Sequence, residues 1–557
     1  MDLLIIAAIA LGVVLVIVIM GIAEKEKFRR YTERKIRSEY GHLNEKGIPL
    51  LRMECIPSYY KRHGGNAGID DITWSDLDMD RLFALMDVTY SSAGEEYLYH
   101  TLRTPLTDKD KLLERDAEIE YFRKEKEERL KLQMQFASMG KNERYSLYDY
   151  LDFADTLKKI PSLPYHFIAP ILAALSVALI FIDTSVGILA LVITIVINMS
   201  WYFKTMNVIQ PYMTSLKYVL KDMKAAEKIL ALKIGICTGL QDDMKEALSE
   251  LRIFKKRAAT AFAESSGDGN PLTILADYTN MLLHPNIIAF YSMYSQMQKH
   301  KEEIDKLHGA LGYLEMLVAA GSFKSAMSSG CVPVFDGGLK AVNIYHPLIE
   351  EPVKNSFEEK GSVLLTGSNA SGKSTFLKTV AVNMLLSQTI NFACADEFHT
   401  GFYRLYTSMA LRDDLEQGDS YFMVEIKALR RILEAAKEEG VRIACFVDEV
   451  LRGTNTVERI AASTQILKFM ERSGMLCFAA THDIELTDLL KDGYSNYHFE
   501  EEIKDGDVIF NYRLMEGKAT TRNAIKLLSV MGYDADVIKE AEDMAERFIK
   551  EGVWKNG

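Results

Sequence analysis

A glycine-rich turn between an apolar run and a helix-forming run constrains this chain more than any other feature. Residues 363–375 read VLLTGSNASGKST, so that Gly367 and Gly372 bracket four residues before a lysine and a serine. This spacing is typical of a phosphate-binding loop between a buried strand and a helix, in which backbone N–H groups and the helix N-terminus surround the phosphates of a nucleotide. The residues assigned to phosphate binding are Gly367, Ser368, Asn369, Ala370, Ser371, Gly372, Lys373, Ser374 and Thr375.

A second apolar run, residues 443–447, ends in two carboxylates, Asp448 and Glu449. An uninterrupted apolar run is typical of a central parallel strand, because such a strand is buried on both faces. In-line phosphoryl transfer needs a metal ion, positive charge and a positioned nucleophile. We therefore predict that Lys373 contacts the β- and γ-phosphates. Ser374 and Asp448 are the predicted Mg²⁺ ligands, and Glu449 is predicted to polarise the attacking water.

A third apolar run, residues 475–480, is followed by Thr481, His482 and Asp483. In an open α/β sheet, side chains at the C-terminal ends of the strands point into the ligand crevice. We therefore predict that His482 contacts the γ-phosphate or the attacking water. The alternative is a structural histidine whose ring only forms hydrogen bonds with neighbouring protein groups.

Further stretches resemble a known family. Residues 412–425 (RDDLEQGDSYFMVE) closely resemble the signature region of the MutS mismatch-repair ATPases. Motifs similar to that family also occur at residues 366–375, 448–456 and 480–487. The resemblance is strong over residues 340–557 and weaker over residues 70–340. It implies an α/β P-loop ATPase domain of the ABC/MutS type beside an all-α lever domain, with ATP and Mg²⁺ as cofactors.

The resemblance also implies a composite site in a homodimer. In this family the signature of one subunit closes over the nucleotide of the other, so Gly418 and Ser420 are expected to bind the nucleotide in trans. The signature here reads EQGDS, and Asp419 places a negative charge where the family more often has a basic residue. The family stacks an aromatic side chain on adenine just before the loop strand. Val353 lies nearest that position, and Phe357 is the alternative.

Two apolar blocks predict a membrane protein. Residues 3–23 are uncharged and long enough to span a bilayer. Seven Lys and Arg residues follow within residues 25–37, and the positive-inside rule places them in the cytoplasm. Residues 167–203 are also apolar and are split near Asp183, which predicts a transmembrane helical hairpin with both ends cytoplasmic. We therefore expect a multi-pass protein of the cell membrane that contacts lipid and has a cytoplasmic ATPase domain. The alternatives are a cleaved signal peptide and a buried hairpin of a soluble core.

The expected domain order follows from these segments. It is a transmembrane anchor (1–23), a basic juxtamembrane segment (24–75), a first helical core part (76–160), a transmembrane hairpin (165–203), a helical lever (204–335), a MutS-like ATPase domain (336–518) and a C-terminal helix–turn–helix for dimerisation (519–557).

The net charge leaves the function of such an ATPase open. At −12 over 557 residues, the chain as a whole lacks the basic footprint of a dedicated DNA-binding protein. The family resemblance nevertheless implies binding to mismatched or structured DNA. A mechanical or signalling membrane ATPase without DNA is the main alternative. Half of an ABC-type transporter is a third and weaker one, because the signature differs from the ABC form.

Overall fold

The computed structural model describes most of the chain. It describes residues 2–552 except 66–67, 143–144, 157–162, 262–270, 369–370, 410–420, 439, 441, 505–506, 520–524, 526–527 and 529–531. In parts of some helices only the backbone is described, as for residues 2–18.

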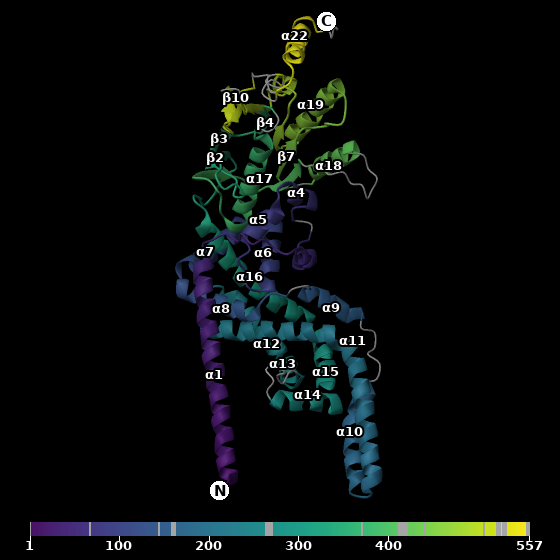
Figure 1. Cartoon of the computed structure of the whole chain (residues 1–557). Coiled ribbons are helices and arrows are strands. Elements are labelled where there is room, and N and C mark those ends of the chain that lie inside the picture. The colour runs from purple at the N-terminus through teal and green to yellow at the C-terminus, as the bar shows by residue number, and fades with distance from the viewer. Residues whose placement is uncertain are drawn as a thin grey trace. The chain divides into compact units, whose positions relative to one another are not determined.

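The chain folds into two compact units that interleave along the sequence (Figure 1). The helical unit comprises residues 1–63, 86–100 and 117–325, and the sheet unit comprises residues 64–85, 101–116 and 326–557. Residues 64–85 and 101–116 therefore group with the sheets, whereas the boundaries expected from the sequence place them in the basic juxtamembrane segment (24–75) and the first helical core part (76–160).

Helices make up the whole of the first unit within the described residues. They are α1 (Asp2–Glu39), α2 (Leu50–Met53), α3 (Ser58–His63), α6 (Ser92–Arg103), α7 (Lys109–Lys124), α8 (Lys126–Met139), α9 (Leu147–Thr156), α10 (Leu163–Ile180), α11 (Thr184–Leu232), α12 (Thr238–Glu250), α13 (Arg252–Ala261), α14 (Pro271–Leu283), α15 (Pro285–Lys299) and α16 (Lys301–Ala326), of which α6, α7 and α16 cross the unit boundary. The core contains charge as well as apolar side chains: the buried Arg52 places Nε 2.6 Å from Glu95 Oε2. Such a buried charge is tolerated because it is paired.

Helices α10 and α11 pack against each other as a hairpin. The turn lies at Asp183, as the sequence predicts, and Asp183 Oδ1 accepts hydrogen bonds from the N–H groups of Ser185 (3.0 Å) and Val186 (3.1 Å). This is an N-cap that satisfies the first free donors of α11. The helices approach closely at Gly187, where a Cβ atom would lie 2.4 Å from the backbone nitrogen of Ile180. A larger residue at this position would push the two arms apart.

Helix α11 does not end where the predicted hairpin ends. It continues from the hairpin past residue 203 to Leu232. Its first half exposes apolar side chains, such as those of Val192 and Val196, whereas Val219 in its second half is fully buried. In that second half, Asp222 accepts a hydrogen bond from the buried His308 of α16 at 2.7 Å. One continuous helix therefore joins the exposed apolar hairpin to the core of the helical unit.

Three membrane spans are not supported by the described residues. Thr184–Gln210 is the one helical stretch there that is long and apolar enough to cross a bilayer, and only 17% of its apolar window is buried. The other arm, Pro164–Ile180, is apolar but shorter. The side chains of most of the expected anchor at residues 3–23 lie outside the described residues, and its backbone forms the first part of α1. A single such helix, judged by length and composition alone, is weak evidence for a membrane protein.

A six-stranded sheet organises the second unit. Its strand order is β12-β9-β4-β8-β7-β6, with all neighbours parallel except the edge strand β12. The strands are β4 (Ser362–Thr366), β6 (Arg404–Ser408), β7 (Ile443–Asp448), β8 (Leu476–Ala480), β9 (Tyr494–His498) and β12 (Met515–Glu516). The central strands β4, β7 and β8 are buried along their whole length, as their apolar sequences predict. The observed parallel α/β sheet matches the fold class expected for the ATPase domain.

Smaller elements complete this unit. A second sheet has the order β1-β5-β2-β3, and β10 pairs with β11 as an antiparallel hairpin. The elements are β1 (Val334–Phe335), β2 (Leu339–Ile344), β3 (Asn355–Glu359), β5 (Glu397–Thr400), β10 (Glu501–Lys504), β11 (Asp507–Phe510), α4 (Asp71–Asp76), α5 (Met79–Met86), α17 (Lys373–Ile390), α18 (Tyr421–Ala435), α19 (Thr456–Arg472), α20 (Glu485–Leu489) and α22 (Ala535–Glu551). Helix α22 lies in the C-terminal segment expected to form a helix–turn–helix, but much of the preceding arm falls outside the described residues.

Candidate active site

The three predicted strand ends meet at one edge of the main sheet. Strand β8 lies between β4 and β7, and all three run parallel. The residues that follow them in the chain are therefore neighbours at the C-terminal edge of the sheet, where open α/β sheets bind ligands. The sheet order thus brings together the phosphate loop after β4, the carboxylates at the end of β7 and the histidine after β8.

Glycine is required at both ends of the phosphate loop. Gly367 has φ +142°, and a Cβ atom there would lie 2.7 Å from the carbonyl oxygen of Phe499. Gly372 has φ +107° and stands immediately before α17, which begins at Lys373. These conformations are strained for residues with a side chain. Between them, Ser371 is buried and its Oγ has no hydrogen-bond partner in the described part of the chain. Asn369 and Ala370 lie outside the described residues.

Lys373 is buried against the loop that it is predicted to serve. Its Nζ donates hydrogen bonds to the carbonyl oxygens of Gly367 (2.8 Å) and Ser368 (2.7 Å). Burial lowers the pKa of Lys373 to about 8, and the charges of Asp448 and Glu449 oppose this shift only in part. The nearby carboxylates therefore do not fully offset the cost of burying the ammonium group. An anionic ligand at the loop would stabilise its charge further.

The two predicted magnesium ligands, a hydroxyl and a carboxylate, are in direct contact. Ser374 Oγ donates a hydrogen bond to Asp448 Oδ2, and Asp448 is buried while Ser374 is exposed at the start of α17. These are oxygen donors of the kind that Mg²⁺ prefers. Among the described residues no group of three or more His, Cys, Asp or Glu side chains is placed to hold a metal ion by itself. The donor set therefore fits an ion that also needs phosphate oxygens and water.

Glu449 is held in an ion-pair network. It has φ +59°, and its backbone N–H donates to the carbonyl oxygen of Ala480 at 2.9 Å. Its carboxylate contacts His482 Nε2 and lies 2.7 Å from Arg452 Nε. Burial alone would raise the pKa of Glu449, but the hydrogen bond from His482 and the charges of Arg452 and Lys373 keep that pKa below its ordinary value. The side chain is therefore an ionised carboxylate.

His482 bridges two of the strand ends. Its Nδ1 lies 2.9 Å from the carbonyl oxygen of Gly367, and its Nε2 contacts the Glu449 carboxylate. Both of these partners are oxygen atoms that can accept a hydrogen bond from the ring. His482 thus connects the phosphate loop to the predicted base, and its predicted contact with the γ-phosphate or the attacking water stays a prediction.

A buried glutamate that sequence reasoning did not assign supports the loop after β7. Glu425, on α18, is 1% exposed, and its Oε1 accepts a hydrogen bond from the backbone N–H of Arg452 at 3.1 Å. Burial raises the pKa of Glu425. It is the last residue of the signature-like stretch, so this contact joins that stretch to the carboxylate loop. Gly418 and Ser420 lie outside the described residues, and their predicted role stays a prediction.

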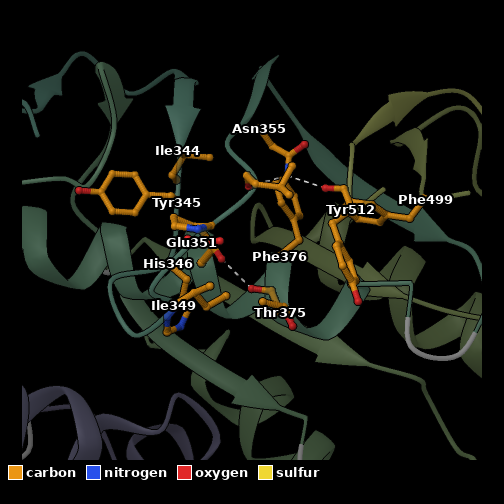
Figure 2. Close-up of a pocket in the computed structure, with 14 residues that line it drawn as sticks. Ile344, Tyr345, His346, Ile349, Glu351, Asn355, Thr375, Phe376, Phe499 and Tyr512 are labelled. Carbon is orange, nitrogen blue, oxygen red and sulfur yellow. Dashed lines mark hydrogen bonds between the residues drawn. The ribbon is translucent and has the colours of Figure 1, made fainter. Parts of the chain in front are cut away.

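A pocket of about 310 Å³ opens beside the phosphate loop. Figure 2 shows Tyr512 on one side of it and, on the other, Ile344, Tyr345, His346 and Ile349. Gly372 and Thr375 form part of the lining, so the pocket begins where the phosphate loop ends. A concave pocket in this position is the candidate site for the base of a nucleotide.

The two residues considered for stacking on the base, Val353 and Phe357, differ in whether they line this pocket. Val353 is among the lining residues and is 42% exposed, whereas Phe357 is 6% exposed and packs against Phe376 and Phe478. The pocket is also lined by four aromatic residues, Tyr345, Phe376, Phe499 and Tyr512. Of these, Tyr512 is 45% exposed and the other three are buried, and sequence reasoning missed Tyr512. Its carbonyl oxygen accepts a hydrogen bond from Asn355 Nδ2 at 3.1 Å, and a Cβ atom on Gly372 would lie 3.1 Å from its ring.

Comparisons with known proteins agree with this geometry. The family model for MutS domain V matches residues 363–549, which include all three strand ends. This part of the chain is therefore similar to domain V of the MutS family. Curated relatives named DNA mismatch repair protein MutS are 30% identical in Thermotoga petrophila (48% of this chain, 35% of that protein), 32% in Pseudothermotoga lettingae (38% and 27%) and 30% in Thermus aquaticus (45% and 31%). The chain thus spans about a third of the length of the curated relatives it matches.

Proposed function

We propose that this protein is a membrane-anchored MutS-like ATPase that binds and hydrolyses ATP. The observation that carries the proposal is the meeting of Lys373, the Ser374–Asp448 pair and Glu449 at one edge of the main sheet. In this proposal the base of ATP enters the pocket lined by Tyr512, and its phosphates lie in the loop. Mg²⁺, held by Ser374 and Asp448, would neutralise phosphate charge.

The proposed reaction assigns the proton to Glu449. The oxygen of a water molecule attacks the γ-phosphorus, and the bond from that phosphorus to the β–γ bridging oxygen breaks, which gives ADP and phosphate. The Glu449 carboxylate accepts the proton of the water. Lys373 stabilises negative charge on the phosphates, and the ring of His482, which contacts both Glu449 and the carbonyl oxygen of Gly367, holds Glu449 close to the loop.

The resting network favours activation by a second subunit. Glu449 is engaged by His482 and Arg452, so it must exchange one of these partners for water before it can act as a base. Closure of a homodimer, with Gly418 and Ser420 of one chain facing the nucleotide of the other, is our proposal for that step. Mixing Lys373→Ala chains with Ser420→Ala chains tests it, because each mixed dimer contains one intact site. Activity should return on mixing, and no recovery in proven mixed dimers would refute a trans role.

The membrane location is supported by exposed apolar side chains. Along the hairpin, the exposed residues include Ile171, Leu175, Leu189, Val192 and Val196. A contiguous apolar surface of this extent is unfavourable in water and is typical of a protein or membrane contact. Figure 1 also shows α1 and the hairpin extending in the same direction from the helical unit. We propose that the two insert into one membrane and that the nucleotide domain is cytoplasmic.

The role of DNA is a separate part of the proposal. Its support is that the curated relatives are DNA mismatch repair proteins. The net charge of −12 and the apolar hairpin instead favour a mechanical or signalling ATPase that acts on the membrane. Titration of detergent-solubilised protein with mismatched and branched DNA at several salt concentrations distinguishes the two. Binding that weakens steeply with salt supports DNA association, and no binding at low salt supports the alternative.

Two variants test the ATPase itself. Lys373→Ala should lose ATP binding and hydrolysis, because the loop loses its positive charge. Glu449→Gln should bind ATP but hydrolyse it slowly. Hydrolysis by Glu449→Gln at the wild-type rate would refute the assignment of the base, and equal ATP binding by wild type and Lys373→Ala would refute the nucleotide site.

A further inference from the structure

A buried carboxylate contacts the phosphate loop from outside the three strand ends. Glu501 is the first residue of β10 and is 6% exposed. Its Oε2 accepts a hydrogen bond from Ser368 Oγ at 2.7 Å. Ser368 is also the residue whose carbonyl oxygen accepts a hydrogen bond from Lys373. The loop is therefore bound by a negative side chain on one side and by its own lysine on the other.

This negative charge opposes the ligand that the loop is built to bind. Backbone N–H groups, the N-terminus of α17 and Lys373 all favour an anion in the loop. The charge of Glu501 is close enough to act on Lys373. A nucleotide brings several negative charges into the same place, and repulsion between like charges is strong at a partly buried site. Glu501 and the phosphates therefore compete for the same positive surroundings.

The chain connects this contact to the base pocket. Strands β10 and β11 form a hairpin in which Glu501 pairs with Phe510. Tyr512 follows two residues later and lines the pocket. The hairpin thus ends on one side at the phosphate loop and on the other side at the base pocket. A bound nucleotide would meet both ends of it.

We propose that Glu501 is an autoinhibitory residue that holds the phosphate loop in its nucleotide-free state through Ser368, and that nucleotide binding breaks this contact. The inference rests on the proposed ATP-binding function. The proposal predicts that Glu501 weakens nucleotide binding. A carboxylate that only stabilised the binding conformation of the loop would instead strengthen nucleotide binding. Releasing Glu501 would also free the β10–β11 hairpin.

Calorimetric titration of the detergent-solubilised full-length protein with Mg-ATP tests the proposal. Glu501→Gln removes the charge and should bind ATP roughly three- to tenfold more tightly than wild type, from the loss of one like-charge interaction at a partly buried site. Glu501→Asp keeps the charge and should stay closer to wild type. Glu500→Gln is the matched control: this carboxylate pairs with His498 at 3.2 Å, and its neutralisation should change affinity less than twofold. Unchanged or weaker binding by Glu501→Gln would overturn the proposal.

Hydrogen exchange of the wild-type protein gives a second measurement that does not depend on a variant. Mg-ATP should make the backbone amides of the β10–β11 hairpin exchange faster, because the Ser368–Glu501 contact is lost. Equal or slower exchange there would overturn the proposal. If neither wild type nor Glu501→Gln binds Mg-ATP, the proposed ATPase function fails and this inference fails with it.

Discussion

The buried lysine of the phosphate loop makes nucleotide binding depend on pH. Burial lowers the pKa of Lys373 to about 8 from an ordinary value of 10.5. Contact with phosphates restores the charged form, so the pKa of Lys373 in the complex should return at least to its ordinary value. Above pH 8, ATP binding must therefore take up a proton. At pH 7 about nine in ten free sites carry a charged lysine, and at pH 9 about one in ten do, so ATP affinity should fall roughly tenfold, or about 1.4 kcal/mol, between these pH values.

Calorimetry between pH 7 and pH 9.5 measures this effect. The wild-type dissociation constant for Mg-ATP should rise above pH 8, and buffers of different ionisation enthalpy should reveal uptake of close to one proton per site at pH 9. Lys373→Arg is the control, because a guanidinium stays charged throughout this range. Whatever its affinity, its binding should be flat with pH. A wild-type affinity that does not change between pH 7 and 9, or an equal slope in Lys373→Arg, would refute the reasoning.

Three further outcomes follow from the same geometry. Glu449→Gln should keep its affinity for Mg-ATP within about threefold and lose at least about a hundredfold in hydrolysis rate, since general-base catalysis contributes that much; loss of binding instead would indicate a structural role. Tyr512→Ala should weaken ATP binding roughly tenfold through loss of stacking, whereas Tyr512→Phe should retain it; equal titrations of the two variants would exclude stacking. A reporter fused after Lys204 should read as cytoplasmic and a tag between Asp183 and Val186 as external; recovery of the full-length protein in the soluble fraction without detergent would contradict the membrane proposal.

The elements of the candidate nucleotide-binding edge were largely predictable because their signals are local. The spacing of Gly367, Gly372 and Lys373 encodes a strand, a turn and a helix start within a few residues, and the structure has β4 and α17 there. The apolar runs before Asp448 and His482 required strands buried on both faces. Strands of that kind pair in parallel, so their C-terminal ends meet.

The limits of the helical hairpin were less predictable. Hydrophobicity places its turn at Asp183 correctly, because a charged residue interrupts an apolar run there. The sequence also predicts a helical segment from residue 204, but it does not reveal that this segment and the second arm of the hairpin form one uninterrupted helix, α11, which ends at Leu232. The interleaving of the two units is likewise a product of long-range contacts.

The sequence by itself predicted the residues of the proposed chemistry: the phosphate loop, Ser374 and Asp448 as magnesium ligands, Glu449 as the base, and an apolar hairpin. Only the tertiary structure decided which side chains surround that chemistry. Tyr512 approaches Gly372 across 140 residues of chain, and Glu501 reaches Ser368 across 133. Neither residue lies in a motif, and no periodicity marks it. Their positions depend on the parallel pairing of β9 with β4. Because of this pairing, the chain that follows β9 lies beside the phosphate loop that follows β4. Contacts of this kind are set by how strands pair in space, and local sequence does not encode that.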